Sequence, residues 1–99
     1  LLEQAPPGVD PDAIGRTIAA VPGVCDVHDL HVWQISDGFP ALSAHVVVDP
    51  GIDAHLALHA IQRAVASCCA IEHTTIQIDV DHARGLRIQS RLEQPQEAP

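Results

Sequence analysis

Histidine and carboxylate side chains stand at strand-like spacing in three segments of this chain. Seven of its 99 residues are His, and Asp and Glu together number 13. Imidazole nitrogens and carboxylate oxygens are groups that bind zinc and similar divalent ions in proteins. Binding such an ion across several strands is therefore the chemistry that these residue types favour first.

The alternation of side chains along the three segments predicts which of them share one face of a sheet. Segment 41–48 has Leu, Ala or Val at every second position, which we assign to the core, so His45 points the other way. The same argument gives segment 74–80 a core side of Ile and Val. Neighbouring strands are about 4.8 Å apart, so side chains on the remaining, open face can converge. This open face collects Asp29, His31, His45, His73, Gln77 and Asp79.

Two other interpretations of these residues stay open. One is a solvated sheet face whose His residues are incidental. The other is acid–base catalysis by a carboxylate–His pair. The chain has no evident nucleophile, phosphate-binding loop or pocket-forming insertion, so we expect that it is not an enzyme. His55 and His59 lie one helical turn apart and could chelate a metal, but no Glu follows His55 as in a H-E-x-x-H site, and we interpret both as exposed surface residues.

Capping and turn residues divide the chain into five elements that must position these side chains. Asp10 before Pro11 predicts a helix start, because Asp caps free N–H groups and Pro suits the first helical position. Asp53 predicts a second helix start in the same way, and Ser-Asp-Gly at 36–38 predicts a turn between two strands. The expected elements are a helix over 10–21, strands over 24–35 and 41–48, a helix over 53–69 and a strand over 74–80.

The order α-β-β-α-β predicts an α+β fold. We expect an open-faced sandwich in which two helices cover one face of a three-stranded mixed sheet, as in copper chaperones and in a truncated ferredoxin-like fold. A right-handed crossover through the second helix is expected to place the third strand beside the first and parallel to it, in the order 2-1-3. Residues 10–81 form the predicted domain, residues 1–9 a lead-in and residues 82–99 a polar, flexible tail.

Charge and core composition limit the partners that this chain can have. Its formal net charge is −8, with five Arg and no Lys, so we expect neither nucleic-acid binding nor direct lipid binding. Trp33 and Phe39 are the only aromatic residues, so the core must consist of small aliphatic side chains. Such a core in a small domain favours association with a partner subunit.

The three Cys residues predict a reducing compartment rather than a disulfide framework, because their number is odd and no C-x-x-C pair is present. Cys68 and Cys69 are adjacent, and neighbours within a helix are not expected to bridge. We place Cys68 in the core as a small apolar side chain, on the helix face that also carries Leu58, Ile61 and Val65.

Three runs of sequence have a characteristic order and spacing: VHDLHVW at 27–33, LSAHV at 42–46 and IEHTTIQID at 71–79. Within the α-β-β-α-β frame they resemble the cytoplasmic C-terminal domain of cation diffusion facilitators, most of all the zinc, cobalt and cadmium efflux branch. The resemblance covers residues 7–81. The chain has no Met and no apolar run near the ~20 residues of a membrane helix, so we expect a soluble fragment of a longer protein.

The resemblance implies a set of metal ligands on the three strands. It points to His28, His45 and Asp79, the last of which stands where the family often has Glu. Glu72 occupies a position that is often His, and His73 lies beside it, so either of the two is the expected fourth ligand.

The ligand from the first strand has two candidates. Strand alternation favours His31 on the open face, whereas the resemblance favours His28. A strand start or a bulge could re-aim His28, so we rank His28 first and keep His31 as the alternate.

The resemblance also implies a function. In that family the domain is a homodimer that lies at the cytoplasmic face of the cell membrane, below the transporter part from which residues 1–9 would lead. Binding of Zn²⁺, or of Co²⁺, Cd²⁺ or Ni²⁺, draws the two copies together and favours transport. The alternatives are an ACT-like domain that binds a small ligand and a metal-independent dimerisation module. A copper chaperone is disfavoured, because residues 8–12 lack its C-x-x-C loop.

Overall fold

The computed structural model describes residues 6–82 and contains the five elements in the predicted order. The observed bounds differ from the predicted ones by two residues at most. Part of the predicted lead-in and nearly all of the predicted tail lie outside the described residues. Within those residues, neither helix has the length and hydropathy of a membrane-spanning segment. The elements are α1 (Pro11–Ala19), β1 (Val24–Ser36), β2 (Phe39–Val48), α2 (Ala54–Cys69) and β3 (His73–Val80).

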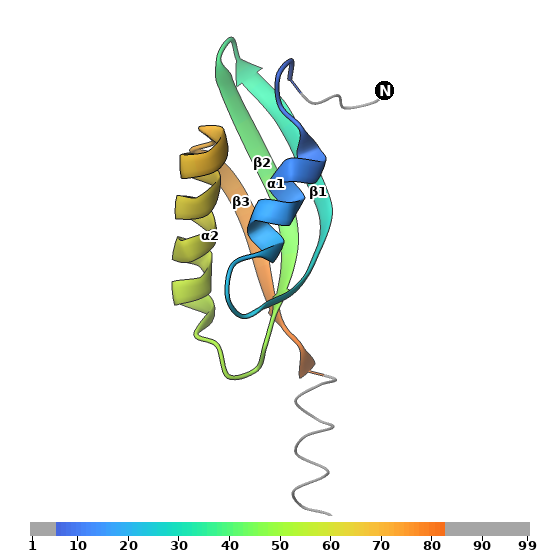
Figure 1. The fold of residues 1–99 in the computed structure, drawn as a ribbon, viewed down its shortest axis with the longest axis vertical. Coiled ribbons are helices and arrows are strands. Elements are labelled where there is room, and N and C mark those ends of the chain that lie inside the picture. Colours follow the sequence, from blue (N-terminus) through green and yellow to red (C-terminus); the bar gives the residue numbers. More distant parts are fainter. Residues whose placement is uncertain (1–5, 83–99) are drawn as a thin grey trace, which may run out of the picture.

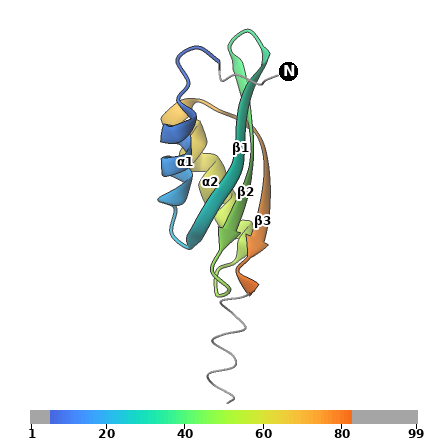
Figure 2. The same ribbon diagram turned by 90° about the vertical axis from the view of Figure 1, so that its right-hand side faces the viewer.

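Both helices pack on one face of the sheet and leave the other face uncovered (Figure 1), as the view from the side shows (Figure 2). This confirms the predicted open-faced α+β sandwich with a mixed sheet. The core between the two layers is aliphatic, and burial of each large side chain contributes about 1.5–3 kcal/mol. Its most deeply buried members are Ile14, Ile18, Leu42, Val46, Val48, Ile61, Val65 and Ile71.

The predicted strand order 2-1-3 is wrong, because β2 is the central strand and the order is β1-β2-β3. The predicted parallel direction of the third strand relative to the first is wrong as well, since β3 runs opposite to β1. β1 pairs antiparallel with β2, and β3 pairs parallel with β2. The physical reason is that α2 follows β2 directly and returns the chain to the end where β2 begins, so the next strand runs parallel to β2. The composition agrees, since β2 buries every second side chain, whereas β1 is polar and irregular, as an edge strand can be.

Capping fixes the starts of both helices as the sequence predicts. Asp10 accepts a hydrogen bond from the backbone N–H of Asp12, and Asp53 accepts from those of His55 and Leu56. The predicted apolar face of α2 is only partly right. Ile61 and Val65 are buried, but Leu58 is half-buried and Cys68 is exposed, while Ala57 and Cys69 pack against the core. The core-facing stripe is therefore rotated by about one residue from the predicted one.

The cysteines at the end of α2 also differ from expectation. Cys68 and Cys69 are joined as a disulfide, contrary to the prediction that neighbours in a helix do not bridge. They are the last two residues of the helix, and Ala70 then takes a left-handed backbone that ends it. Cys25, on β1, is exposed, and its Sγ donates a hydrogen bond to Oδ1 of Asp49 at 3.0 Å.

Gly23, between α1 and β1, occupies a position that only glycine fits. Its φ is +91°, and a Cβ there would lie 2.6 Å from Cγ1 of Ile52. We predict that Gly23→Ala lowers the free energy of unfolding by about 2–4 kcal/mol, because backbone strain and overpacking add. Gly38→Ala is the matched control, since its φ is +78° with open space around it, and it should lose only about 1–2 kcal/mol. Equal losses in urea denaturation would show that the approach of Ile52 is not tight.

Candidate metal centre

A bulge in β1 places two predicted ligands on the same face of the sheet. His28 opposes His45 and His31 opposes Ser43, so β1 has one more residue than β2 over this stretch. Asp29, inside the bulge, takes a left-handed backbone with φ 52°. An extra residue interrupts strand alternation, so His28 and His31 both lie on the helix-free face with His45. The conflict between alternation and resemblance therefore disappears.

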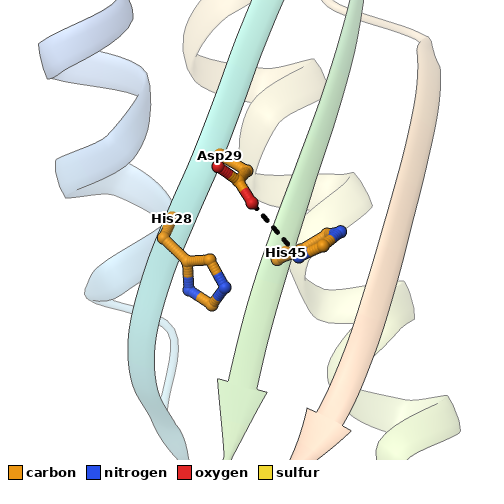
Figure 3. A group of neighbouring side chains, drawn as sticks. All are labelled: His28, Asp29 and His45. Atoms are coloured by element: carbon orange, nitrogen blue, oxygen red, sulfur yellow. Dashed lines mark ion pairs between the residues drawn. The ribbon is translucent and has the colours of Figure 1, made fainter.

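His28, Asp29 and His45 form a cluster on this face, which we call the sheet-face cluster. One ligand atom of each residue lies within 4.8 Å of the others. The rings of His28 and His45 meet edge to face, with centroids 5.2 Å apart. Oδ2 of Asp29 lies 3.5 Å from Nδ1 of His45 (Figure 3). Ligand atoms of a tetrahedral zinc site are about 3.3 Å apart, given bonds near 2.0 Å, so small side-chain rotations would close the cluster on an ion.

Asp26 orients the first imidazole of the cluster. Its Oδ2 lies 2.8 Å from Nδ1 of His28. When Nδ1 carries the proton and donates a hydrogen bond to this carboxylate, the lone pair of Nε2 remains available to a metal. Carboxylates in this position orient metal-binding imidazoles and raise their basicity. The sequence reasoning missed Asp26, although its position two residues before His28 in a strand was a usable signal.

The cluster is open to solvent and locally acidic. The side chains of His45, His28 and Asp29 are 39%, 46% and 64% exposed. A hydrated ion can therefore reach the three side chains directly from solvent. The carboxylates of Asp26 and Asp29 supply negative charge beside the imidazoles. The sequence reasoning placed Asp29 on the open face but did not count it among the ligands.

Asp79 lies on the same face, two residues beyond the position on β3 that opposes His45. Gln77 opposes His45 in the β2–β3 ladder, and Asp79 opposes Val47. Nε2 of Gln77 is 3.3 Å from each carboxylate oxygen of Asp79 and donates to them. Asp79 is thus connected to the neighbourhood of His45 through Gln77, and its role as a ligand stays a prediction.

His31 contributes to a hollow on the helix-free face. This hollow has a volume of about 320 Å³. His31 stays the alternate first-strand ligand, since it shares this wall with two members of the sheet-face cluster. The hollow is lined by Asp29, His31, Ser43, Ala44, His45, Thr75 and Gln77.

Glu72 and His73 lie at the start of β3, away from the cluster. His73 opposes Ala41, which is four residues from His45 and so about 13 Å away along an extended strand. A single chain does not bring either side chain to the sheet-face cluster. Their predicted role as the fourth ligand would need a second chain or a different ion.

The chain matches one protein family model and is similar in sequence to several known transport proteins. Residues 6–81 match the family model described as the cytoplasmic domain of cation efflux proteins. Over 80% of its length, the chain is 39% identical to a probable zinc transporter protein of Dictyostelium discoideum. Over 94% of its length, it is 33% identical to the cadmium, cobalt and zinc/H(+)-K(+) antiporter of Bacillus subtilis. The chain spans 14% of the first of these proteins and 32% of the second.

Solved structures share the fold. The metal-bound C-terminal domain of the CzcD transporter from Cupriavidus metallidurans superimposes with a TM-score of 0.68 at 35% identity, over 72% of this chain and 99% of that one. The cadmium form of a MamM C-terminal domain variant superimposes with a TM-score of 0.62 at 25% identity, over 70% of this chain and 90% of that one. The α-β-β-α-β arrangement is therefore common to this chain and these domains.

Asp29 combines a left-handed backbone with a side chain beside His45, and two substitutions separate these features. Asn tolerates the left-handed region, so we predict that Asp29→Asn changes the free energy of unfolding by less than about 0.5 kcal/mol. A β-branched residue does not, so Asp29→Val should lose about 1–3 kcal/mol. Urea denaturation of both variants measures the difference. Equal stability of the two would contradict the bulge conformation.

Proposed function

This chain belongs to the family of cytoplasmic domains of cation efflux proteins, and on that premise we propose that it is the metal-sensing regulatory domain of a divalent-cation transporter. The observation that supports the proposal is the sheet-face cluster, in which two imidazoles and a carboxylate converge on the helix-free face. The relatives named above are transport proteins, in agreement with the prediction that the chain is not an enzyme.

The ligand set favours an ion of the zinc type. Two imidazoles with one carboxylate suit Zn²⁺, and also Co²⁺, Cd²⁺ or Ni²⁺, whereas Ca²⁺ and Mg²⁺ prefer oxygen ligands alone. The Bacillus subtilis antiporter is named for cadmium, cobalt and zinc. The similar MamM domain was solved in a cadmium form. These names support a cation of the same group for this chain.

The position of the cluster suits a homodimer. β1 is an edge strand of the sheet, and an exposed edge is normally covered or kept irregular. The sheet-face cluster involves this edge strand and the strand beside it, so a second chain can approach it from the edge or from the helix-free face. The matched family model is itself named for a dimer.

The negative charge of the chain gives the ion its regulatory effect. Each chain has a formal net charge of −8, so two copies repel each other. A divalent ion reduces this repulsion where carboxylates face each other and joins ligands by direct bonds. The ion can shift the dimer only by the difference between its affinities for the closed and open forms. Each tenfold preference for the closed form contributes about 1.4 kcal/mol.

The cluster has room for further ligands. Three side chains leave at least one position of a tetrahedral ion to be filled. One predicted candidate is Asp79, which accepts a hydrogen bond from Gln77, and another is His31, which shares the hollow with the cluster. Glu72 and His73, at the start of β3, would act from the partner chain. We propose that closure of the dimer completes the shell, and that residues 10–81 are sufficient for this response.

Zinc titration of the 99-residue chain tests the proposal. We expect zinc binding by calorimetry, together with a fall in the radius of gyration of the dimer measured by small-angle scattering. His45→Ala removes one ligand and should weaken zinc binding at the sheet-face cluster by about tenfold or more. Loss of a residue that only hydrogen-bonds a metal ligand already lowers metal affinity by about 10–100-fold. His82→Ala is the control, because His82 is exposed and outside the cluster. Zinc-independent dimerisation that is equal in all three proteins would favour a pure dimerisation module.

Acid should release the ion, because an imidazole binds metal only in its neutral form. We predict that zinc affinity falls as the pH is lowered, by up to about tenfold per pH unit for each imidazole that must lose a proton. The two imidazoles of the wild-type cluster should give a steeper fall than the single imidazole of His28→Ala. Titrations at several pH values measure both slopes. An affinity that does not change with pH would exclude imidazole ligation.

A further inference from the structure

A second pair of imidazoles lies on α2 and takes no part in the sheet-face cluster. His55 and His59 are both exposed and stand one helical turn apart. Their Nε2 atoms are 3.2 Å apart, and their rings meet edge to face with centroids 4.6 Å apart. The sequence alone left this pair as surface residues. The structure adds that the two side chains point their Nε2 atoms at each other.

We propose that His55 and His59 form a separate chelating site for a divalent transition-metal ion that prefers imidazole, with Cu²⁺ bound more tightly than Zn²⁺. Two ligand atoms that bind one ion at about 2.0–2.1 Å are about 2.9–3.4 Å apart. The observed 3.2 Å lies within this range, so the separation of the two nitrogens already suits a shared ion, and the rings have only to turn until both lone pairs face it. Without metal, the Nε2–H of one imidazole donates a hydrogen bond to Nε2 of the other. When the ion binds, that proton moves by way of solvent to Nδ1 of the same ring, so both neutral rings present an Nε2 lone pair to the ion.

The first turns of α2 hold both imidazoles in place. Asp53 accepts hydrogen bonds at 2.9 and 3.2 Å from the backbone N–H groups of His55 and Leu56. Ala57 and Ile61, on the opposite side of these turns, are buried in the core. The backbone under the pair is therefore fixed before an ion binds, which lowers the entropy that chelation must remove.

The charges near the pair have opposite effects on a cation. Asp53, His59 and Arg63 line one hollow beside α2. The Asp53 carboxylate offsets the positive end of the helix dipole, whereas the Arg63 guanidinium disfavours a second positive charge. The selectivity for a metal then rests on the two imidazoles, and the remaining positions of the ion are left to water.

This site is independent of the sheet-face cluster. α2 covers the opposite face of the sheet (Figure 2), so no side chain can belong to both sites. The pair also needs no second chain, because both ligands come from one helix. An ion held there connects two successive turns and stabilises the folded state by linkage, since the unfolded chain does not hold the spacing.

Copper titration of the His45→Ala chain tests the proposal, because this background weakens the sheet-face cluster and leaves the helix pair intact. We expect a Cu²⁺ complex with two nitrogen ligands in electron paramagnetic resonance and a Cu²⁺-dependent rise in the melting temperature. Adding His55→Ala or His59→Ala should weaken Cu²⁺ binding by about tenfold or more, because the second ligand is then no longer held close to the first. Circular dichroism checks that the helix remains folded.

Moving the pair along α2 provides the matched control. His55→Ala with Arg63→His rebuilds a spacing of four residues with His59 and should restore tight Cu²⁺ binding. His55→Ala with Arg63→Gln and Ala66→His keeps the same charge and number of His, but the two imidazoles stand seven residues, or about 10.5 Å, apart, and binding should stay weak. Equal affinity of the two variants, or no loss on removal of His55, would overturn the proposal.

Discussion

The sheet-face cluster depends on one local constraint, the extra residue in β1 between His28 and His31. Without it, strict alternation would turn one of these two imidazoles into the core. With it, Asp29 takes a left-handed backbone and lies beside His45, while His28 meets His45 across the ladder. A bulge of this kind disturbs a ladder, and an edge strand tolerates it because its other side has no partner within the described residues. The edge position of β1 therefore permits the bulge, and β2 beside it provides the His45 side chain that His28 and Asp29 meet.

Charge relates this local geometry to regulation. The chain is acidic, and the carboxylates of Asp26 and Asp29 stand next to the imidazoles at the edge of the sheet. These neighbouring charges lower the stability of the folded chain only slightly while the side chains stay hydrated. They do, however, repel a second acidic chain that approaches this edge. In the proposed function, a divalent ion reverses that balance, and the exposed ligands allow the ion to bind and leave. On the other side of the molecule, the site that we propose on α2 relies on the rigidity of a helix, so the two proposed sites differ in how their ligands are held.

The sequence predicted the elements and the open face, but not the arrangement of the strands. Caps at Asp10 and Asp53 and the period-two pattern of β2 have local causes, so they can be read from neighbouring residues. The strand order depends on whether β3 is added beside β1 or beside β2, and it was wrong because the third strand was placed beside β1. The resemblance pointed to His28, which the structure brings beside His45, and alternation alone could not have placed His28 on that face across a bulge. Asp26 was missed because its contribution is a contact with another side chain.

The most direct test of the account is anomalous diffraction at the zinc edge from crystals of the zinc-loaded chain. We predict a peak about 2.0–2.1 Å from an imidazole nitrogen of His28 and of His45, with an oxygen of Asp29 in the same shell and further ligands from Asp79 or the partner chain. A zinc ion bound elsewhere, with His28 and His45 still in contact and unligated, would contradict it.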